Sequence, residues 1–193
     1  HIATALLFVG FTSSCSDFLD RYPLDELSDS SFWKTENDAM MAVTDIYGCL
    51  PTWDQDEDIN SDNAVHGIKW AAGNISKGIY DPMDQSWAGS YTPIRQCNLV
   101  LEKVKDIEMS DESRKKIEGQ AYFFRAFVYF NLIRSFGDVP YIDKPLNLTD
   151  VEDITRTPRE EVYAKVMADF DKAIEYLPEE WDAANTPRVT KGA

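Results

Sequence analysis

Apolar residues recur at intervals of three and four in separate stretches of the chain, which is the spacing of one helix face. The first stretch follows Thr35, a residue type that caps helix N-termini, and stops before Pro51. The second covers residues 85–106. The third covers residues 111–136, after a capping Ser110. The pattern therefore predicts three helices over these ranges.

A fourth helix has a strong predicted start at Thr157. This residue is the expected N-cap, with Pro158 at the first helical position and Glu160 completing a capping box. A buried stripe of apolar residues then continues until Pro178 ends the helix.

The four predicted helices occur without a convincing strand pattern, so we expect an all-α fold. The second helix with the third, and the third with the fourth, suit antiparallel pairs of the tetratricopeptide-like kind. The third helix carries aromatic residues on nearly every side between Tyr122 and Phe130, which indicates burial between neighbours. Gly137-Asp138-Val139-Pro140 is a clear stop signal after it.

The segment from 52 to 86 has no helical or strand period and is predicted to be a long irregular loop region. Loops of this length in compact domains are uncommon and often functional. Sugar sites combine a stacking aromatic ring with carboxylate or amide groups that bind hydroxyls, and such groups gather here. The alternative is that each Trp only packs the loop onto the helices. The predicted ligand-binding residues are Trp53, Asp62, Trp70, Asn74 and Tyr80.

The first residues are typical of an export signal. The apolar run 2–11 is too short to span a bilayer and fits the hydrophobic region of a signal peptide without its basic start. Thr12-Ser13-Ser14-Cys15 is similar to a bacterial lipobox, although Leu is usual where Thr12 stands. We therefore expect residues 1–14 to be a truncated signal peptide and Cys15 to be lipidated. The alternative is a buried apolar segment followed by a chance Cys.

The net charge of the chain limits the classes of molecule that it is expected to bind. With 34 acidic and 19 basic residues, the net charge is −15. This balance argues against nucleic acid, which needs clustered Lys and Arg, and against binding to anionic lipid through a basic face. Neutral ligands remain compatible with it.

No catalytic motif stands out, so we expect a protein that is not an enzyme and has no cofactor. After Cys15, His66 is the only His. The alternating acids from Asp54 to Asp62 are spaced like calcium ligands, but Ile59 and Val65 replace the Gly and Glu of an EF-hand. We therefore predict no metal site and a solvated acidic loop.

Two further thiols, Cys49 and Cys97, are predicted to be free. In an exported protein a disulfide between them is the alternative.

Several ordered blocks together resemble the SusD/RagB family of outer-membrane lipoproteins. The blocks are Cys15-Ser-Asp-Phe-Leu-Asp, Ser31-Phe-Trp-Lys-Thr35, Trp87-x3-Tyr91-x2-Ile94-x3-Asn98, Gly119-Gln-Ala-Tyr-Phe-Phe-Arg125-Ala, Phe136-Gly-Asp-Val-Pro140, Thr157-Pro-Arg-Glu-Glu-Val-Tyr163 and Arg188-Val-Thr-Lys-Gly-Ala193. The resemblance implies a helical, cell-surface protein that captures an oligosaccharide or other nutrient. It also implies delivery to a SusC-like TonB-dependent transporter in the outer membrane, without cleavage.

On this basis residues 15–34 are expected to be the tether of the lipid anchor. Residues 35–193 are expected to be an N-terminal helical domain that is incomplete at its C-terminus. Arg125 is expected to meet an acidic partner or helix ends. The alternative function is a helical-repeat scaffold lipoprotein that binds only protein partners.

Overall fold

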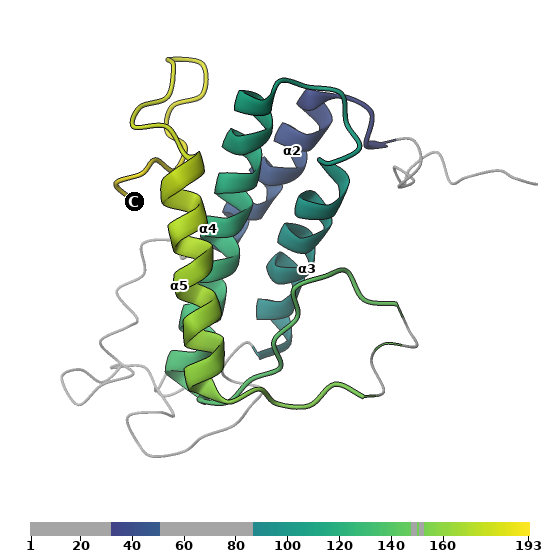
Figure 1. Ribbon diagram of the computed structural model, residues 1–193, viewed down its shortest axis with the longest axis vertical. Coiled ribbons are helices and arrows are strands. Elements are labelled where there is room, and N and C mark those ends of the chain that lie inside the picture. Colours follow the sequence, from purple (N-terminus) through teal and green to yellow (C-terminus); the bar gives the residue numbers. More distant parts are fainter. Residues whose placement is uncertain (1–31, 51–86, 148–149, 151–152) are drawn as a thin grey trace, which may run out of the picture. The chain divides into compact units, whose positions relative to one another are not determined.

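The computed structural model describes residues 32–50, 87–147, 150 and 153–193 (Figure 1). Within these ranges the secondary structure is helical, and the only extended pairing is an isolated bridge between Val139 and Thr157. The elements are α2 (Glu36–Ile46), a short 3-10 helix η2 (Tyr47–Cys49), α3 (Trp87–Lys103), α4 (Asp111–Phe136) and α5 (Arg159–Tyr176). The predicted all-α fold is confirmed.

The starts of α2 and α4 follow the predicted caps. The Thr35 hydroxyl accepts a hydrogen bond from the amide of Asp38, whose carboxylate accepts one from the Thr35 amide at 2.7 Å. This reciprocal capping box satisfies two amides that the helix itself leaves without partners. Ser110 caps α4 in the simpler way and accepts from the amide of Ser113 at 3.0 Å.

The predicted cap of α5 is wrong. Thr157 pairs its backbone with Val139 in the bridge, and the N-cap position belongs to Pro158, whose ψ of 138° is not helical. Because a Pro side chain offers no acceptor, the helix is capped from elsewhere. The Asp138 carboxylate accepts a hydrogen bond from the amide of Arg159 at 2.9 Å.

The end of α4 is fixed by Gly137, as the stop signal predicts. Gly137 has a φ of +70°, which other residues rarely adopt, and its amide still bonds the carbonyl of Ile133. The chain therefore leaves the helix abruptly and enters the extended connector towards α5.

The helices form antiparallel pairs, as predicted. Trp87 at the start of α3 meets Phe136 at the end of α4, with ring centroids 4.9 Å apart. Gly119 in the first half of α4 lies against Leu177, directly after α5. Thus α3, α4 and α5 run up, down and up beside one another, which is the tetratricopeptide-like arrangement (Figure 1).

Two groups of buried apolar residues hold the helices together. The first group joins α2, α3 and the first half of α4, and the second joins the start of α3 and the other half of α4 to α5 and the connector. Their largest fully buried members are Ile46, Ile94, Ile117, Phe124, Tyr129 and Leu132. Among the described residues, none of the helices has the length and apolarity that crossing a bilayer requires.

The connector between α4 and α5 is attached by side chains of the helices. The Tyr129 hydroxyl accepts from the amide of Ile142 at 2.6 Å and donates to the carbonyl of the same residue. Asn98 donates to that carbonyl as well, at 2.9 Å. These bonds satisfy backbone groups of an extended segment that has no sheet to join.

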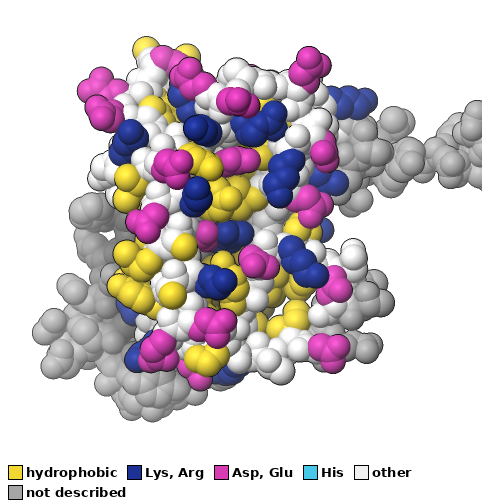
Figure 2. All heavy atoms as spheres, in the orientation of Figure 1, with side chains coloured by type: hydrophobic (Ala, Val, Ile, Leu, Met, Phe, Trp, Pro, Cys, Tyr) yellow, Lys and Arg dark blue, Asp and Glu magenta, His cyan; other side chains and the backbone are white. Residues whose placement is uncertain are grey.

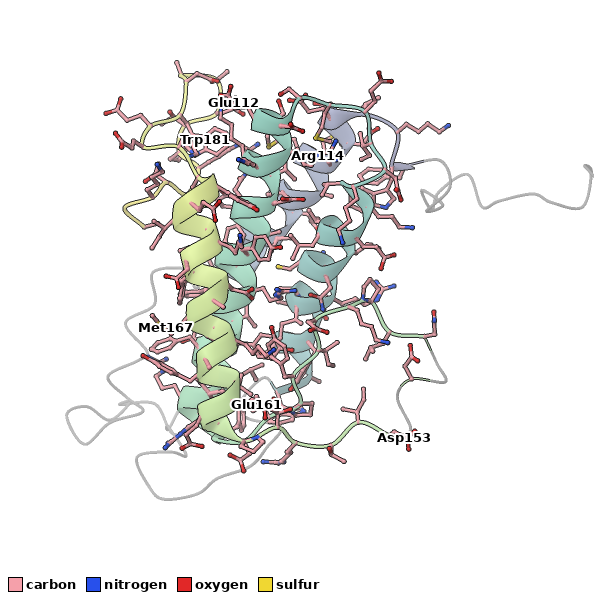
Figure 3. The ribbon with its side chains drawn as sticks, in the orientation of Figure 1. Glu112, Arg114, Asp153, Glu161, Met167 and Trp181 are labelled. Carbon is pink, nitrogen blue, oxygen red and sulfur yellow. The ribbon has the colours of Figure 1, made fainter. Side chains whose placement is uncertain are left out.

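The last residues fold back to the first helix. The Tyr47 hydroxyl accepts from the amide of Val189 at 3.0 Å and donates to Gln120 of α4 at 2.9 Å. Trp181, labelled in Figure 3, donates its indole N–H to the carbonyl of Val189 at 2.7 Å. Tyr47 therefore joins the beginning, the middle and the end of the described chain.

The thiols of Cys49 and Cys97 are both free, as predicted. Cys97 is fully buried in the first core group, whereas Cys49 is half-buried.

Candidate functional site

A hollow with a volume of about 390 Å³ lies where the end of α2, η2, the start of α3 and the middle of α4 meet. This volume is within the range of small-ligand sites. The lining is mixed and includes polar side chains, an aromatic ring and two glycines. Its members are Asp45, Gly48, Cys49, Gly89, Ser90, Thr92, Pro93, Gln96, Phe127, Val128 and Asn131.

Two amide side chains supply hydrogen-bonding groups to this hollow. Gln96 donates to the carboxylate of Asp45 at 2.6 Å, and Asn131 donates to the carbonyl of Phe127 at 3.0 Å. Each of these bonds uses one donor of an amide group that has two donors and one acceptor oxygen. Paired donors and acceptors of this kind suit the vicinal hydroxyls of a sugar.

Phe127 supplies an apolar ring beside those groups. Its ring stacks nearly parallel on that of Phe123, at 13° and with centroids 6.3 Å apart. This contact restricts how the Phe127 ring can turn. A ring held in place next to amide groups is the combination that sugar sites use.

The start of α3 forms one side of the same hollow. Pro93 lies inside α3 and has no N–H, so the carbonyl of Gly89 cannot form the usual helical bond to position 93. Gly89 lines the hollow, and a Cβ added there would meet nothing within 4 Å. The start of α3 therefore leaves open space beside Gly89.

None of the ligand-binding residues predicted from the sequence lies in the described part of the chain. Trp53, Asp62, Trp70, Asn74 and Tyr80 all belong to residues 51–86. Cys49 and Gly89, which lie two positions before and three positions after that range, both line the hollow. The hollow is thus lined by residues that are close in the sequence to both ends of the predicted ligand-binding segment.

The hollow itself was not predicted. Phe127 and Asn131 lie four positions apart, so they share a face of α4, and this spacing was visible in the sequence. The aromatic run around them pointed to burial instead. Gln96 and Asp45 come together only through the packing of α2 against α3, which sequence spacing does not reveal.

A second polar cluster is buried between α3, α4 and α5. Arg125 forms two hydrogen bonds of 2.7 Å to the carboxylate of Asp169 and one of 2.8 Å to the side chain of Asn98. Burial acts to lower the pKa of Arg125, but the hydrogen bonds and charge of Asp169 raise this pKa above its ordinary value. The expected acidic partner of Arg125 is confirmed.

This buried cluster is structural. In the described residues, every buried side-chain nitrogen and oxygen has a hydrogen-bond partner. A ligand would have to break hydrogen bonds in which the polar groups of this cluster already satisfy one another. Arg125, Asp169 and Asn98 therefore hold the three helices in register.

Within the described ranges, no three His, Cys, Asp or Glu side chains lie close enough together to hold a metal ion. The alternating acids from Asp54 to Asp62, and His66, lie outside those ranges, as does the predicted lipidation residue Cys15.

Comparison with known proteins identifies the family. Residues 17–193 match the family model "SusD-like", described as starch-binding and associating with the outer membrane. SusD-like protein P2 of Formosa agariphila is 30% identical over 180 residues, which cover 86% of this chain and 35% of that protein.

Solved structures share the fold. A SusD-like protein from Bacteroides fragilis superposes with a TM-score of 0.75 at 25% identity, over 89% of this chain and 35% of that one. A laminarin-binding SusD-like protein superposes with a TM-score of 0.73 at 24% identity, over 82% of this chain and 38% of that one. The chain thus spans little more than a third of these relatives. From its matched length, its fold and its ordered sequence blocks, we conclude that the chain belongs to the SusD-like family.

Proposed function

We propose that this protein is a cell-surface lipoprotein that captures an oligosaccharide and delivers it to a SusC-like TonB-dependent transporter in the outer membrane. Family membership carries this proposal, because the matching family is described as starch-binding and outer-membrane-associated. Two solved proteins with the same fold are described as laminarin-binding and as a surface glycan-binding protein. The proposed role is capture and transfer, without cleavage of the glycan.

The hollow beside α2, α3 and α4 supports this role through its chemistry. Phe127 offers a ring for the apolar side of a sugar, and Gln96 and Asn131 offer amide groups for its hydroxyls. We infer that the glycan contacts this hollow and the predicted residues Trp70 and Asn74 of the adjoining segment. A chain with net charge −15 favours a neutral glycan over an anionic one.

The test is binding of neutral glycans by the full-length protein. Native gels containing laminarin, starch or xylan should retard its migration in at least one case, and titration calorimetry with the corresponding oligosaccharides gives the dissociation constant. Trp70→Ala and Asn131→Ala should each weaken binding by about tenfold, which corresponds to the loss of about 1.4 kcal/mol. Asn37→Ala removes the same amide group from an exposed position of α2 that does not line the hollow, and should leave binding unchanged.

The possible results separate three classes of protein. Binding that survives Trp70→Ala and Asn131→Ala would reject the site but keep the function. Absence of binding to any glycan, with a transporter still co-purifying, would favour the scaffold that binds only protein. Release of a reporter group from a chromogenic glycoside would identify an enzyme and contradict the proposal.

Anchoring at Cys15 needs its own experiment. In the native bacterium, metabolic labelling with an alkyne fatty acid should label the protein, and Cys15→Ala should abolish both the label and its recovery in outer-membrane fractions. Cys49→Ala is the matched control and should change neither result.

A further inference from the structure

The hollow beside α2, α3 and α4 contains a fixed negative charge. Among the described residues that line it, Asp45 is the only acidic or basic side chain. It is exposed and lies in the last turn of α2. The other polar side chains of this lining are hydroxyls, amides and a thiol, which carry no formal charge. A ligand in the hollow is therefore bound next to one carboxylate.

The helix in which Asp45 lies does not account for a carboxylate at this position. The C-terminal end of a helix carries a partial negative charge, so cations stabilise it and anions do not. The last turn of α2 has no basic residue. Asp45 therefore adds to the negative potential at the end of α2, and its role has to be sought in the hollow.

The start of α3 contributes the opposite partial charge to the same hollow. Gly89 and Ser90, in the first turn of α3, are part of the lining. A helix N-terminus is equivalent to about half a positive charge, and a C-terminus to about half a negative one. The two helix ends thus largely offset each other. The full charge of Asp45 then decides the sign of the potential, which is negative.

The hydrogen-bond partner of Asp45 does not neutralise this charge. Its carboxylate accepts a hydrogen bond of 2.6 Å from the uncharged amide of Gln96. Arg188, the cation attached near the end of α2, donates instead to Thr44 at 3.0 Å and to Gln120 at 3.2 Å. Neither of these two residues lines the hollow.

A carboxylate distinguishes sugars by their charge. It has about four lone-pair sites and no donor, and Gln96 uses one of them. Hydroxyl groups of a neutral sugar can donate to the remaining sites, and such bonds to a charged oxygen are about twice as strong as neutral ones. A carboxylate or sulfate group on a sugar has no proton to donate at neutral pH, and it carries the same charge as Asp45.

We propose that Asp45 is a specificity-determining residue of the hollow, which selects uncharged glycans and rejects glycans that carry carboxylate or sulfate groups. This inference rests on the proposed capture of a glycan. It assigns the selection to one carboxylate rather than to the net charge of −15. Acidic and basic side chains lie mixed over the face shown in Figure 2, and salt screens exposed charges beyond about 8 Å. Distant acids therefore contribute little inside the hollow.

Competition between two forms of one glycan tests the assignment in the full-length protein. The first form is the laminarin or starch oligosaccharide that binds, and the second is the same oligosaccharide with its primary hydroxyls oxidised to carboxylates. If only xylan binds, xylan with glucuronate branches is the second form. Two like charges about 4 Å apart cost about fivefold in affinity in bulk water and more where water is partly excluded. The oxidised form should therefore bind about tenfold more weakly.

Three variants identify the source of this difference. Asp45→Asn keeps the shape of the side chain and an acceptor for Gln96, and should reduce the ratio of the two dissociation constants to about twofold, since the repulsion is removed. Asp45→Glu keeps the charge and should keep the ratio. Asp171→Asn changes the net charge by the same amount at an exposed position of α5 outside the hollow, and should also keep the ratio. Raising the NaCl concentration should lower the ratio of the wild-type protein.

The outcomes separate this inference from the proposed function. Equal binding of the two forms by the wild-type protein would reject the selection and leave glycan capture in place. An unchanged ratio in Asp45→Asn would also reject it, and so would an equal loss of the ratio in Asp171→Asn, which would assign the selection to net charge. No binding of any glycan by the wild-type protein would reject the proposed function and this inference together.

Discussion

Arg125 of α4 and Asp169 of α5 form a bidentate ion pair between two helices, with both N–O distances at 2.7 Å. The two side chains are only 8% and 9% exposed, so water contributes little to satisfying their charges. Asp169→Ala would leave a buried guanidinium without its counter-charge, and should lower the free energy of unfolding by about 3–5 kcal/mol. Urea unfolding followed by circular dichroism measures this change.

The exposed pair of Lys172 and Glu175 on the same helix is the control for Asp169→Ala. Its atoms are 3.1 Å apart, but both side chains are about half exposed. Glu175→Ala should leave the urea midpoint unchanged within error, because solvent screens such pairs. If Glu175→Ala costs as much as Asp169→Ala, then burial is not what makes the Arg125 pair strong.

Gly119 lets α4 approach the end of α5 closely. A Cβ at this position would lie 3.0 Å from Leu177 and 3.1 Å from Tyr176. Gly119→Ala should therefore destabilise the protein by about 1–3 kcal/mol through overpacking, even though Ala is the better helix former. Gly89→Ala in α3 meets nothing within 4 Å and should be neutral or slightly stabilising. Thermal unfolding of the two variants separates these outcomes, and equal midpoints would contradict the close approach.

The cap of α5 can be assigned by a pair of variants. Asp138→Ala removes the carboxylate that accepts from the Arg159 amide, and should cost about 1 kcal/mol. Thr157→Val keeps the backbone bridge to Val139 and should cost much less, because the Thr157 side chain does not cap the helix. Denaturant titration gives both values. A larger loss of stability for Thr157→Val than for Asp138→Ala would show that Thr157 is the N-cap, as the sequence predicted.

Tyr47→Phe removes a hydroxyl that bonds both Gln120 and the Val189 amide. We expect a loss of about 1–2 kcal/mol, since a part-buried donor and acceptor lose their partner. Hydrogen exchange should report faster exchange at the Val189 amide, and limited proteolysis should reach residues 178–193 more easily. Tyr163→Phe changes an exposed hydroxyl and serves as the matched control. Unchanged exchange at Val189 would show that this hydrogen bond does not hold the segment.

Cys97 should resist alkylation in the folded protein. Burial raises the pKa of the Cys97 thiol far above its ordinary value, so the reactive thiolate is absent at about pH 8. Burial also raises the pKa of the half-buried Cys49, which should react slowly but faster than Cys97. Peptide mapping after iodoacetamide treatment measures both rates. Labelling of Cys97 as fast as in urea would contradict its burial.

The same pKa shift makes alkaline pH destabilising. The Cys97 thiol ionises near its ordinary pKa of about 8.5 only in the unfolded chain. Stability that is fully present below that pH is therefore lost progressively as the pH rises above it. Cys97→Ala should remove this part of the pH dependence.

The sequence predicts the helices well because their signals are local. Thr35, Ser110 and Gly137 each set a boundary through bonds within a few residues. The prediction of Thr157 as the N-cap of α5 was wrong because the capping carboxylate belongs to Asp138. Asp138 lies 19 positions before Thr157 and reaches the start of α5 only through the fold of the connector. Local rules identify a sequence that can cap a helix, but they do not show whether a side chain from a distant part of the sequence accepts the hydrogen bond instead.

The candidate site was less accessible to prediction for a similar reason. Asp45 and Gln96 are 51 positions apart and meet only when α2 packs on α3. Composition alone pointed to residues such as Trp70, which stay predictions because they lie outside the described residues. Arg125 was predictable in part, because a charge inside an aromatic helix requires a partner, although the sequence does not name Asp169 or Asn98.

The contact between Tyr47 and Val189 has a consequence for how the protein is made. The two residues are 142 positions apart, so a ribosome has to finish nearly the whole of this region before the bond can form. Helices α3, α4 and α5 can assemble through nearer neighbours in the meantime. Long-range closure of this kind is slow compared with local helix pairing. Because α2 already packs on α3 and α4 through the first core group, the segment around Val189 is the part of the described chain that is fixed last.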